Sequence, residues 1–264
     1  MIAANKVRLP IRLPDIVTRA REHFALTKLI QHTKTSYQPY IAQTRRQREA
    51  AHNMRYQVFT EELKLEPPNE KRMQQDKFDE YSIITLLSLH EPFGYCGTLR
   101  IVEPYFDDQL LPIESHCIDA ISDERYHPSL FQRDEICVIS RLAIPLEFRM
   151  HRDFYRDAGS FSSSSAIKGR VDGLPIAAIC LYLSAAAIII SSGRQHAYVM
   201  VYPAMAKRLA AIGLQFKQIG DIVDYNGKRA PFYINANDIH KTLKSSYRPL
   251  FNEYLQYFSD VENV

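Results

Sequence analysis

The sequence lacks the features of several large protein classes. Its four cysteines form no C-x-x-C pair, so we expect small buried residues and not disulfides. Its formal net charge of +3 is too small to predict nucleic-acid binding. Its longest apolar run, from Pro175 to Ile190, is shorter than the roughly 20 residues of a membrane-spanning helix, which predicts a buried helix there.

Targeting, nucleophile and metal-binding signals are also missing. No secretory signal is visible at the amino terminus, and together with the cysteine usage this predicts a cytoplasmic protein. The G-x-S-x-G motif of serine hydrolases is absent. We expect no metal site, because metal-ligand spacing is not found among His90, His116, His127, His151 and His196.

The most informative stretch runs from Glu135 to Pro145. It is apolar and β-branched enough to predict a buried central strand, which Pro145 should end because proline lacks the N–H donor of the ladder. Arg141 stands near the end of this strand. Burying a guanidinium without a partner is costly, so an acidic residue elsewhere must neutralise it. We expect that partner to be Asp76 or Asp79.

The remaining patterns predict one domain of mixed architecture. Helices and strands follow in the order helix, antiparallel strands, central strand, helix, strand, helix and strands. This order predicts an α+β (mixed α/β) domain over residues 46–264, preceded by a helical extension over residues 1–45. In the expected strand 94–102, alternation predicts one face shared by Cys96, Thr98, Arg100 and Val102.

Several short motifs occur in the order found in a known superfamily. Four motifs resemble the autoinducer synthase branch of the GNAT acyltransferases. They are Arg55-x-x-Val58-Phe59, Asp76-x-Phe78-Asp79, Gly97-Thr98-Leu99-Arg100 and Ser140-Arg141-Leu142. The carboxyl half more closely resembles N-acyl amino acid synthases and the acyltransferases associated with PEP-CTERM/exosortase systems. The residues that carry this resemblance are Gly213-Leu214-x-Phe216, Ile219-Gly220 and Tyr225-x-Gly227-x-Arg229-x-Pro231. The resemblance covers about residues 45–236.

This resemblance implies a fold and a reaction. The fold would be GNAT-like, with a central mixed, mostly antiparallel sheet flanked by helices. The reaction would transfer an acyl group from an acyl-carrier-protein thioester to an amine. No tightly bound cofactor is implied, because the acyl-phosphopantetheine thioester of acyl carrier protein would be a co-substrate.

The sequence departs from related patterns at two places. GNAT enzymes that use coenzyme A carry a Gln/Arg-x-x-Gly-x-Gly/Ala loop that binds its pyrophosphate. No such loop follows Leu146, which is also usual for the branch that the chain resembles. Homoserine-lactone synthases usually have a glutamate three residues before the strand arginine, where this chain has Val138. This argues against lactone synthesis.

Aminolysis of a thioester needs a neutral amine, so a carboxylate or an ordered water is expected as base. Asp76 and Asp79 are the best candidates. The alternative is that both only form ion pairs with arginines. In the related family these charges order the loop that closes over the acyl donor. The expected ion-pair partners are Arg55, Arg100 and Arg141.

Further candidates lie on the central strand and the first helix of the domain. Glu135 stands six residues before Arg141, an even step that predicts a shared strand face. It is either a substitute base or a surface charge. Arg100 and Arg141 suit forked binding of a carboxylate, or a purely structural pair. The expected substrate contacts are Arg55 and Phe59, which are four residues apart on a helix, and the strand residues Ile139, Ser140 and Leu142, near which main-chain N–H groups can form an oxyanion site.

A basic segment follows the central strand. It is either a solvated loop or a docking site for an acidic carrier protein, because opposite charges steer such encounters. Its cationic residues are Arg149, Arg152, Arg156, Lys168 and Arg170.

These observations predict an N-acyltransferase that forms an amide between a fatty acyl group and an amino acid or related amine. Its partners would be acyl carrier protein and the small acceptor. One alternative is an acyl-homoserine-lactone synthase. The other is a non-catalytic protein that uses a GNAT cleft to hold an acyl-carrier protein or a lipid.

Overall fold

The computed structural model describes residues 13–89, 94–149, 170–171 and 174–262. The helices are α1 (Leu13–Ser36), α2 (Arg45–Tyr56), α3 (Pro112–Cys117), α4 (Leu146–Arg149), α5 (Ile176–Ser191), α6 (Pro203–Ile212), α7 (Ala236–Thr242) and α8 (Arg248–Glu262). The strands are β1 (Tyr37–Ile41), β2 (Ser82–Leu89), β3 (Gly94–Val102), β4 (Ile136–Ala143), β5 (Arg170–Val171), β6 (Leu174–Pro175), β7 (His196–Val201), β8 (Lys217–Gln218), β9 (Val223–Asp224) and β10 (Lys228–Asn235).

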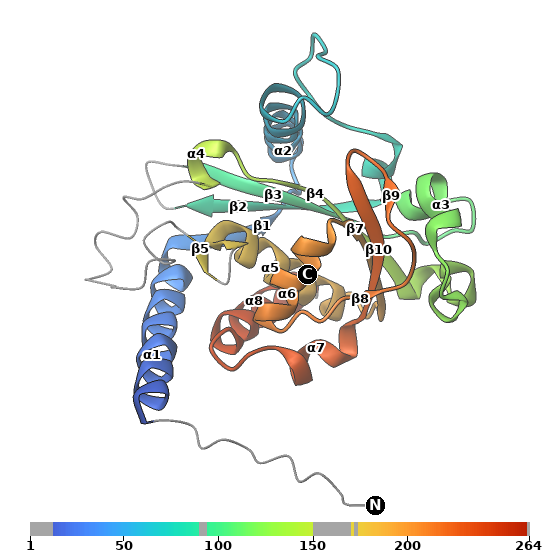
Figure 1. Cartoon of the computed structure of the whole chain (residues 1–264). Coiled ribbons are helices and arrows are strands. Elements are labelled where there is room, and N and C mark those ends of the chain that lie inside the picture. Colours follow the sequence, from blue (N-terminus) through green and yellow to red (C-terminus); the bar gives the residue numbers. More distant parts are fainter. Residues whose placement is uncertain (1–12, 90–93, 150–169, 172–173, 263–264) are drawn as a thin grey trace, which may run out of the picture.

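One twisted sheet organises the molecule (Figure 1). Its strand order is β1-β2-β3-β4-β7-β10-β8, and β9 pairs with β10. The pairing of β4 with β7 is parallel, and the other pairs of this sheet are antiparallel. This arrangement confirms the predicted mixed α/β class with a mostly antiparallel sheet.

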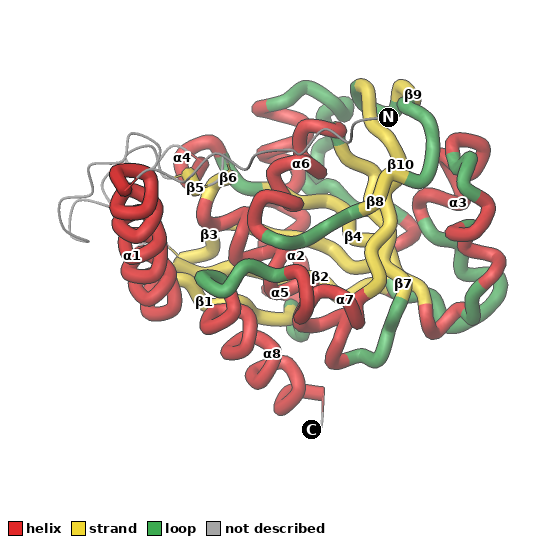
Figure 2. Tube along the Cα trace, turned by 60° about the horizontal axis from the view of Figure 1, so that its bottom comes forward, coloured by secondary structure: helices red, strands yellow, loops and turns green. Residues whose placement is uncertain are grey.

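Helices cover both faces of the sheet. On one face α2 packs its Ala51 against Ile84 and Leu86 of β2 (Figure 1). On the other face α5, α7 and α8 lie together (Figure 2), and their apolar residues form a large core with β2, β3 and β4. Helix α5 is buried along almost its whole length, which confirms the buried helix expected there. None of the described helices is long and apolar enough to cross a membrane.

Strand β1 lies within the segment expected to be an extension. It pairs along its whole length with β2, from Tyr37 opposite Leu89 to Ile41 opposite Thr85. The domain boundary at residue 45 stays a prediction, but the sheet begins before it.

Strand β3 has the predicted limits but not the predicted faces. The register shifts between Leu87 and Ser88, which changes the side to which the first residues of β3 point. Cys96 consequently packs in the same core as Leu99 and Ile101. The prediction that Cys96 shares a face with Arg100 is therefore wrong, because a bulge interrupts the alternation.

The central strand β4 separates from β7 halfway along its length. Their parallel pairing covers Ile136–Ile139 and His196–Val199, although both strands continue. On the other side of β4, Ser140 lies opposite Arg100 and Ala143 opposite Thr98. Three steps along β4 thus match two along β3, which defines a bulge. The space left between β4 and β7 is the region in which the candidate site lies.

Candidate active site

Two aspartates enclose a short turn before β2. The 3-10 helix η2 (Lys77–Tyr81) begins with Asp76, whose side chain accepts a hydrogen bond from Phe78 N at 3.0 Å. The Asp79 carboxylate accepts one from Asp76 N at 2.8 Å. This reciprocal capping box fixes both carboxylates relative to each other, three residues apart.

The Asp79 carboxylate forms a buried forked pair with Arg55. The Nη1 and Nη2 atoms of Arg55 donate to its two oxygens at 2.7 and 2.9 Å. Arg55 is 0% exposed, and its Nε donates to Gln74 Oε1 at 2.6 Å. Because the guanidinium is fully enclosed, the bidentate geometry offsets part of its desolvation. The pair also ties α2 to the turn before β2.

Asp76 joins the two arginines of the central strands. Arg100 Nη1 lies 2.5 Å from Asp76 Oδ1, and Arg141 Nη2 lies 3.0 Å from Asp76 Oδ2. Arg100 also approaches Asp79 at 3.1 Å and donates from Nε to Ser140 Oγ at 3.1 Å. The expectation that Arg141 is neutralised from the 76–79 segment is confirmed. We call the set Arg55, Asp76, Asp79, Arg100 and Arg141 the arginine–aspartate cluster.

The cluster keeps both aspartates ionised. Burial alone would raise the pKa of Asp79, but the hydrogen bonds and charges of Arg55 and the charge of Arg100 hold it well below its usual range. Burial opposes ionisation of Asp76 too, yet the Arg100 and Arg141 charges lower the pKa of that carboxyl. Both are therefore carboxylates near neutrality, and both are weak proton acceptors.

Arg141 reaches Asp76 from an unusual backbone conformation. Its φ of 53° lies in the left-handed region, which is unfavourable for a residue with a Cβ. The residue forms the bulge of β4 opposite β3. Its guanidinium also lies over the Phe59 ring, 5.8 Å from the centroid, and 3.7 Å from Glu66. Residues 55 to 66 thus contact the end of β4.

Two cavities meet at the end of β4. A small cavity of about 70 Å³ is lined by charged and polar residues, among them Asp76, Arg100 and Arg141, and by apolar ones, among them Phe78 and Val138. A larger cavity of about 440 Å³ lies between the separated strands. The residues that line both are Ile139, Ser140, Arg141, Met200 and Arg229.

The walls of the larger cavity are mainly apolar. They come from the segment after α2, from both separated strands and from the helices behind them. Its apolar and aromatic wall residues include Phe59, Leu63, Leu142, Tyr182, Val199 and Met205. The three strand residues expected to contact substrate, Ile139, Ser140 and Leu142, all lie at this cavity, as does Phe59.

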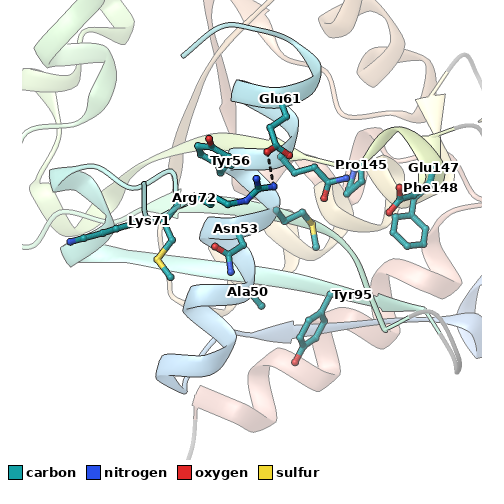
Figure 3. A pocket seen from close by; sticks show the side chains of 13 residues that line it. Ala50, Asn53, Tyr56, Glu61, Lys71, Arg72, Tyr95, Pro145, Glu147 and Phe148 are labelled. Carbon is teal, nitrogen blue, oxygen red and sulfur yellow. Dashed lines mark ion pairs between the residues drawn. The ribbon is translucent and has the colours of Figure 1, made fainter. Parts of the chain in front are cut away.

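A third cavity, of about 610 Å³, lies beside α2 and contains none of the predicted catalytic residues. Figure 3 shows its lining side chains, among which Arg72 and Glu61 neutralise each other at 2.6 Å. Although this cavity has the largest volume of the three, it lacks the arginine–aspartate cluster. We therefore place the candidate site at the two cavities that meet on β4.

The structure corrects the expectation for Glu135. This residue belongs to the 3-10 helix η6 (Arg133–Glu135), before β4 begins, and its carboxylate accepts a hydrogen bond from Gln132 N at 3.1 Å. The bulge at Arg141 further breaks the alternation on which the shared face relied. The predicted common face of Glu135 and Arg141 is therefore wrong, and Glu135 lines neither cavity at the candidate site.

The predicted docking residues fall mostly outside the described part of the chain. Arg152, Arg156 and Lys168 are not described, and of Arg170 only the main chain is. Arg149 is described, lines the larger cavity and forms an ion pair with Glu62. Its charge is thus already partnered within the molecule.

Sequence reasoning missed residues that converge on the site from later in the chain. His116, Tyr225 and Arg229 line the small cavity beside the cluster. The rings of His116 and Tyr225 stack with centroids 5.9 Å apart. Burial raises the pKa of Tyr225. The only sequence signal for two of them was their place in the Tyr225-x-Gly227-x-Arg229 motif. Within the described chain, no group of His, Cys, Asp or Glu side chains is placed to hold a metal ion.

Comparisons with known proteins bear on the fold and on the class of enzyme. Residues 54–156 match the family described as acetyltransferase (GNAT) domain. This match agrees with the predicted enzyme class, an acyltransferase, which is thereby confirmed. A search of curated proteins found no significant match.

Solved structures with a similar fold include acyl-homoserine lactone synthases and an N-acyl amino acid synthase. TofI, in a ternary complex with an inhibitor and MTA, is 14% identical, with a TM-score of 0.54 over 82% of this chain and 96% of TofI. FeeM, an N-acyl amino acid synthase from uncultured soil microbes, is 14% identical, with a TM-score of 0.53 over 80% of this chain and 97% of FeeM. BjaI, a CoA-dependent acyl-homoserine lactone synthase with SAM and isopentyl-CoA, is 14% identical, with a TM-score of 0.52 over 83% of this chain and 89% of BjaI. At these identities the similarity establishes the fold.

The first prediction concerns the buried pair. We expect Arg55→Ala to lower the free energy of unfolding by about 3–5 kcal/mol, because Asp79 would lose its forked partner in the interior. Urea unfolding measures the effect. Arg45→Ala is the matched control on the same helix, because its side chain is 92% exposed and pairs only with Glu49 among described residues; its midpoint should not change. Equal midpoints for Arg55→Ala and wild type would contradict this assignment.

The second prediction concerns pH. A carboxyl whose pKa is lowered by folding stabilises the native state above its unfolded pKa of about 3.9, and this contribution is lost as pH falls further. The difference in unfolding free energy between wild type and Asp79→Asn should therefore be constant from about pH 5 to 7 and shrink below about pH 4. Urea unfolding at stepped pH measures it. A difference that does not change with pH would show that Asp79 is not held ionised by the cluster.

Proposed function

We propose that the protein is an N-acyltransferase that forms an amide between a fatty acyl group and an amino acid or related amine. The observation that carries the proposal is the meeting, at the end of β4, of a mainly apolar cavity and a smaller cavity that contains charged residues of the arginine–aspartate cluster. An amide-forming enzyme must bind an apolar acyl chain and a polar acceptor so that they touch at one point. The residues shared by the two cavities mark that point.

The larger cavity is proposed as the site of the acyl donor. Its volume of about 440 Å³ lies within the usual range of small-ligand sites, roughly 300–1,000 Å³. Phe59, Leu142 and Tyr182 offer apolar walls to an acyl chain. The main chain of β4 beyond Ile139 has separated from β7, and its N–H groups are proposed to polarise the thioester carbonyl.

The small cavity is proposed as the site of the acceptor. The amine nitrogen forms a bond to the acyl carbonyl carbon, the carbon–sulfur bond breaks, and the thiol leaves with the proton that the amine gives up. Asp76 is the ionised carboxylate of this cavity and is proposed to orient the amine by accepting its N–H. Because the pKa of Asp76 is lowered, it is a weak base, so deprotonation of the amine is expected to depend on an ordered water as well.

Arg100 and Arg141 are proposed to hold Asp76 in place in the reaction. The buried forked pair of Asp79 and Arg55 is proposed to support them, because Asp79 accepts a hydrogen bond from Asp76 N and lies 3.1 Å from Arg100. In this proposal Asp76 contacts the reacting amine, and Asp79 serves only in the ion-pair network.

Lactone synthesis is the second candidate, because the acyl-homoserine lactone synthase BjaI has a similar fold. The residue that speaks against it is Val138, which is buried and lines the small cavity where homoserine-lactone synthases usually have a glutamate. We therefore favour an acceptor that is acylated without lactone closure. We also propose that the protein is related to the acyltransferases associated with PEP-CTERM/exosortase systems, which its carboxyl half resembles in sequence.

The acyl donor is proposed to be a thioester of acyl carrier protein. BjaI is CoA-dependent, so the fold by itself is compatible with either donor. The support for a carrier protein comes from the sequence: no glycine-rich pyrophosphate loop follows Leu146, and the segment after it carries several cationic residues. Such a segment suits an acidic protein surface better than a compact diphosphate.

The third prediction tests the product. Expression of the chain should add N-acyl amino acids or acyl amides to organic extracts of the culture, detected by mass spectrometry. Arg141→Ala should reduce them by about 100-fold, because Asp76 would lose one of the two arginines that position it. Acyl-homoserine lactones in the extract would instead support the second candidate. Extracts identical to those of an empty-vector control would favour a non-catalytic binding protein.

The fourth prediction tests the donor. With the same acyl chain, the carrier-protein thioester should be used better than the coenzyme A thioester. Its rate should fall as salt rises, because exposed charges are screened over about 8–10 Å at physiological ionic strength. Steady-state kinetics at low and high salt measure both effects. Equal or better use of acyl coenzyme A, without salt dependence, would refute the carrier-protein donor.

Charge reversal locates the docking segment in the same assay. Arg152→Glu with Arg156→Glu should raise the KM for the carrier protein more than it lowers kcat, because the residues would contact the donor far from its thioester. Lys207→Glu with Arg208→Glu is the matched control, since both side chains are exposed on α6. An equal rise in KM for both double variants would indicate a general effect of net charge.

A further inference from the structure

Arg229 differs from the other arginines of the site in lacking an acidic partner. Arg55, Arg100 and Arg141 each pair with Asp76 or Asp79. Within the described part of the chain, Arg229 forms no ion pair, and its Nε, like that of Arg141, is buried without a hydrogen-bond partner. A buried guanidinium donor that remains unsatisfied is costly. Its position between the two cavities, both of which it lines, therefore suggests a ligand.

The β9–β10 hairpin holds Arg229 in place. Arg229 lies opposite Val223 in this hairpin, and its guanidinium stacks over the Tyr202 ring, 5.2 Å from the centroid. Tyr202 Oη in turn donates to Asn226 O at 3.0 Å. Gly227, with φ of 99°, allows this contact, because a Cβ there would come within 2.5 Å of Tyr202 Oη. The ring fixes the guanidinium plane and leaves its N–H groups for a ligand.

The small cavity has an excess of positive charge. Its lining contains the guanidiniums of Arg100, Arg141 and Arg229 and one carboxylate, that of Asp76. Behind Arg100, the Asp79 carboxylate is balanced by its forked partner Arg55. The Glu66 carboxylate, 3.7 Å from Arg141, compensates one further charge at most. At least one positive charge therefore remains, and the unpartnered arginine is the one to which it belongs. An acceptor that carries an anionic group would complete the balance.

We infer that Arg229 binds the carboxylate of the acceptor, and that the acceptor is an α-amino acid and not a simple amine. The inference rests on the proposed function and names the substrate class of the same site. A planar carboxylate matches the guanidinium fork. In an α-amino acid the nitrogen is two bonds from the carboxyl carbon, so a carboxylate at Arg229 keeps the amine within the same cavity of about 70 Å³ as Asp76.

Matched acceptor pairs test the inference. Tyrosine with tyramine, and phenylalanine with phenethylamine, differ only by the carboxylate. Wild type should have the higher kcat/KM for the amino acid of each pair. Arg229→Gln should lower kcat/KM for the amino acids by about 10- to 100-fold, since a charged hydrogen bond contributes about 1.5–3 kcal/mol, and leave the amines within about twofold. Arg229→Lys should retain part of the preference, because it keeps the charge without the fork.

The control variant is Arg208→Gln, an exposed arginine on α6 outside both cavities. It should keep the wild-type preference. Circular dichroism melting of each variant shows whether a loss of rate is a loss of folding. A wild type that uses amine and amino acid equally, or an Arg229→Gln variant that loses both equally, would overturn the inference. A higher KM for the donor thioester alone would place Arg229 on the phosphate of phosphopantetheine instead.

A binding measurement separates this inference from the proposed function. Titration calorimetry compares N-dodecanoyl-tyrosine with N-dodecanoyl-tyramine on the full chain. The carboxylate ligand should bind wild type about tenfold or more tightly, and Arg229→Gln should abolish the difference. If this holds while no acceptor is acylated, the proposed reaction fails and the carboxylate site stands. If amines are acylated and the two ligands bind wild type equally, the carboxylate site fails and the reaction stands.

Discussion

The site depends on one requirement: the guanidinium of Arg55, enclosed at the base of α2, has to be neutralised where water does not reach. Asp79 meets it with a forked pair, which places the turn before β2 against α2. The capping box then fixes Asp76 relative to Asp79. Asp76 in turn brings together Arg100 of β3 and Arg141 of β4. A single buried charge thus determines how a helix, a turn and two strands meet.

The same arrangement explains why the chemistry is placed at the end of β4. Strand β4 is held on one side by β3, through Arg100 and Ser140, and is released on the other side after Ile139. The released length opens an apolar space towards α5, while the aspartate turn closes a polar one. Two binding environments, one mainly apolar and one charged, therefore lie next to each other at the end of β4. A paired strand would have left no room for either.

Electrostatic necessity was readable from the sequence, and local backbone geometry was not. The partner of Arg141 could be predicted because an arginine in an apolar strand needs a carboxylate, and Asp76 and Asp79 stand three residues apart in the polar segment before β2. The limits of β3 matched those predicted for the strand 94–102. The left-handed conformation of Arg141 and the register shift after Leu87 depend on pairing with neighbouring strands, which alternation cannot foresee. For the same reason Glu135 was misplaced. Arg229 was missed because only the fold brings the start of β10 to the cavities at the end of β4.

The first strand has a consequence for how the protein can be shortened. Strand β1 is the outer strand of the sheet beside β2, and Pro39 within it cannot donate to a further neighbour. Residues before Ala42 look dispensable in sequence, yet without them the eight residues of β2 would become the rim of the sheet. An uncovered rim is a template for pairing with another chain. A truncated protein would keep its reactive residues but tend to aggregate through β2. Aggregation, and not loss of catalytic residues, therefore limits how far the chain can be shortened from its amino end.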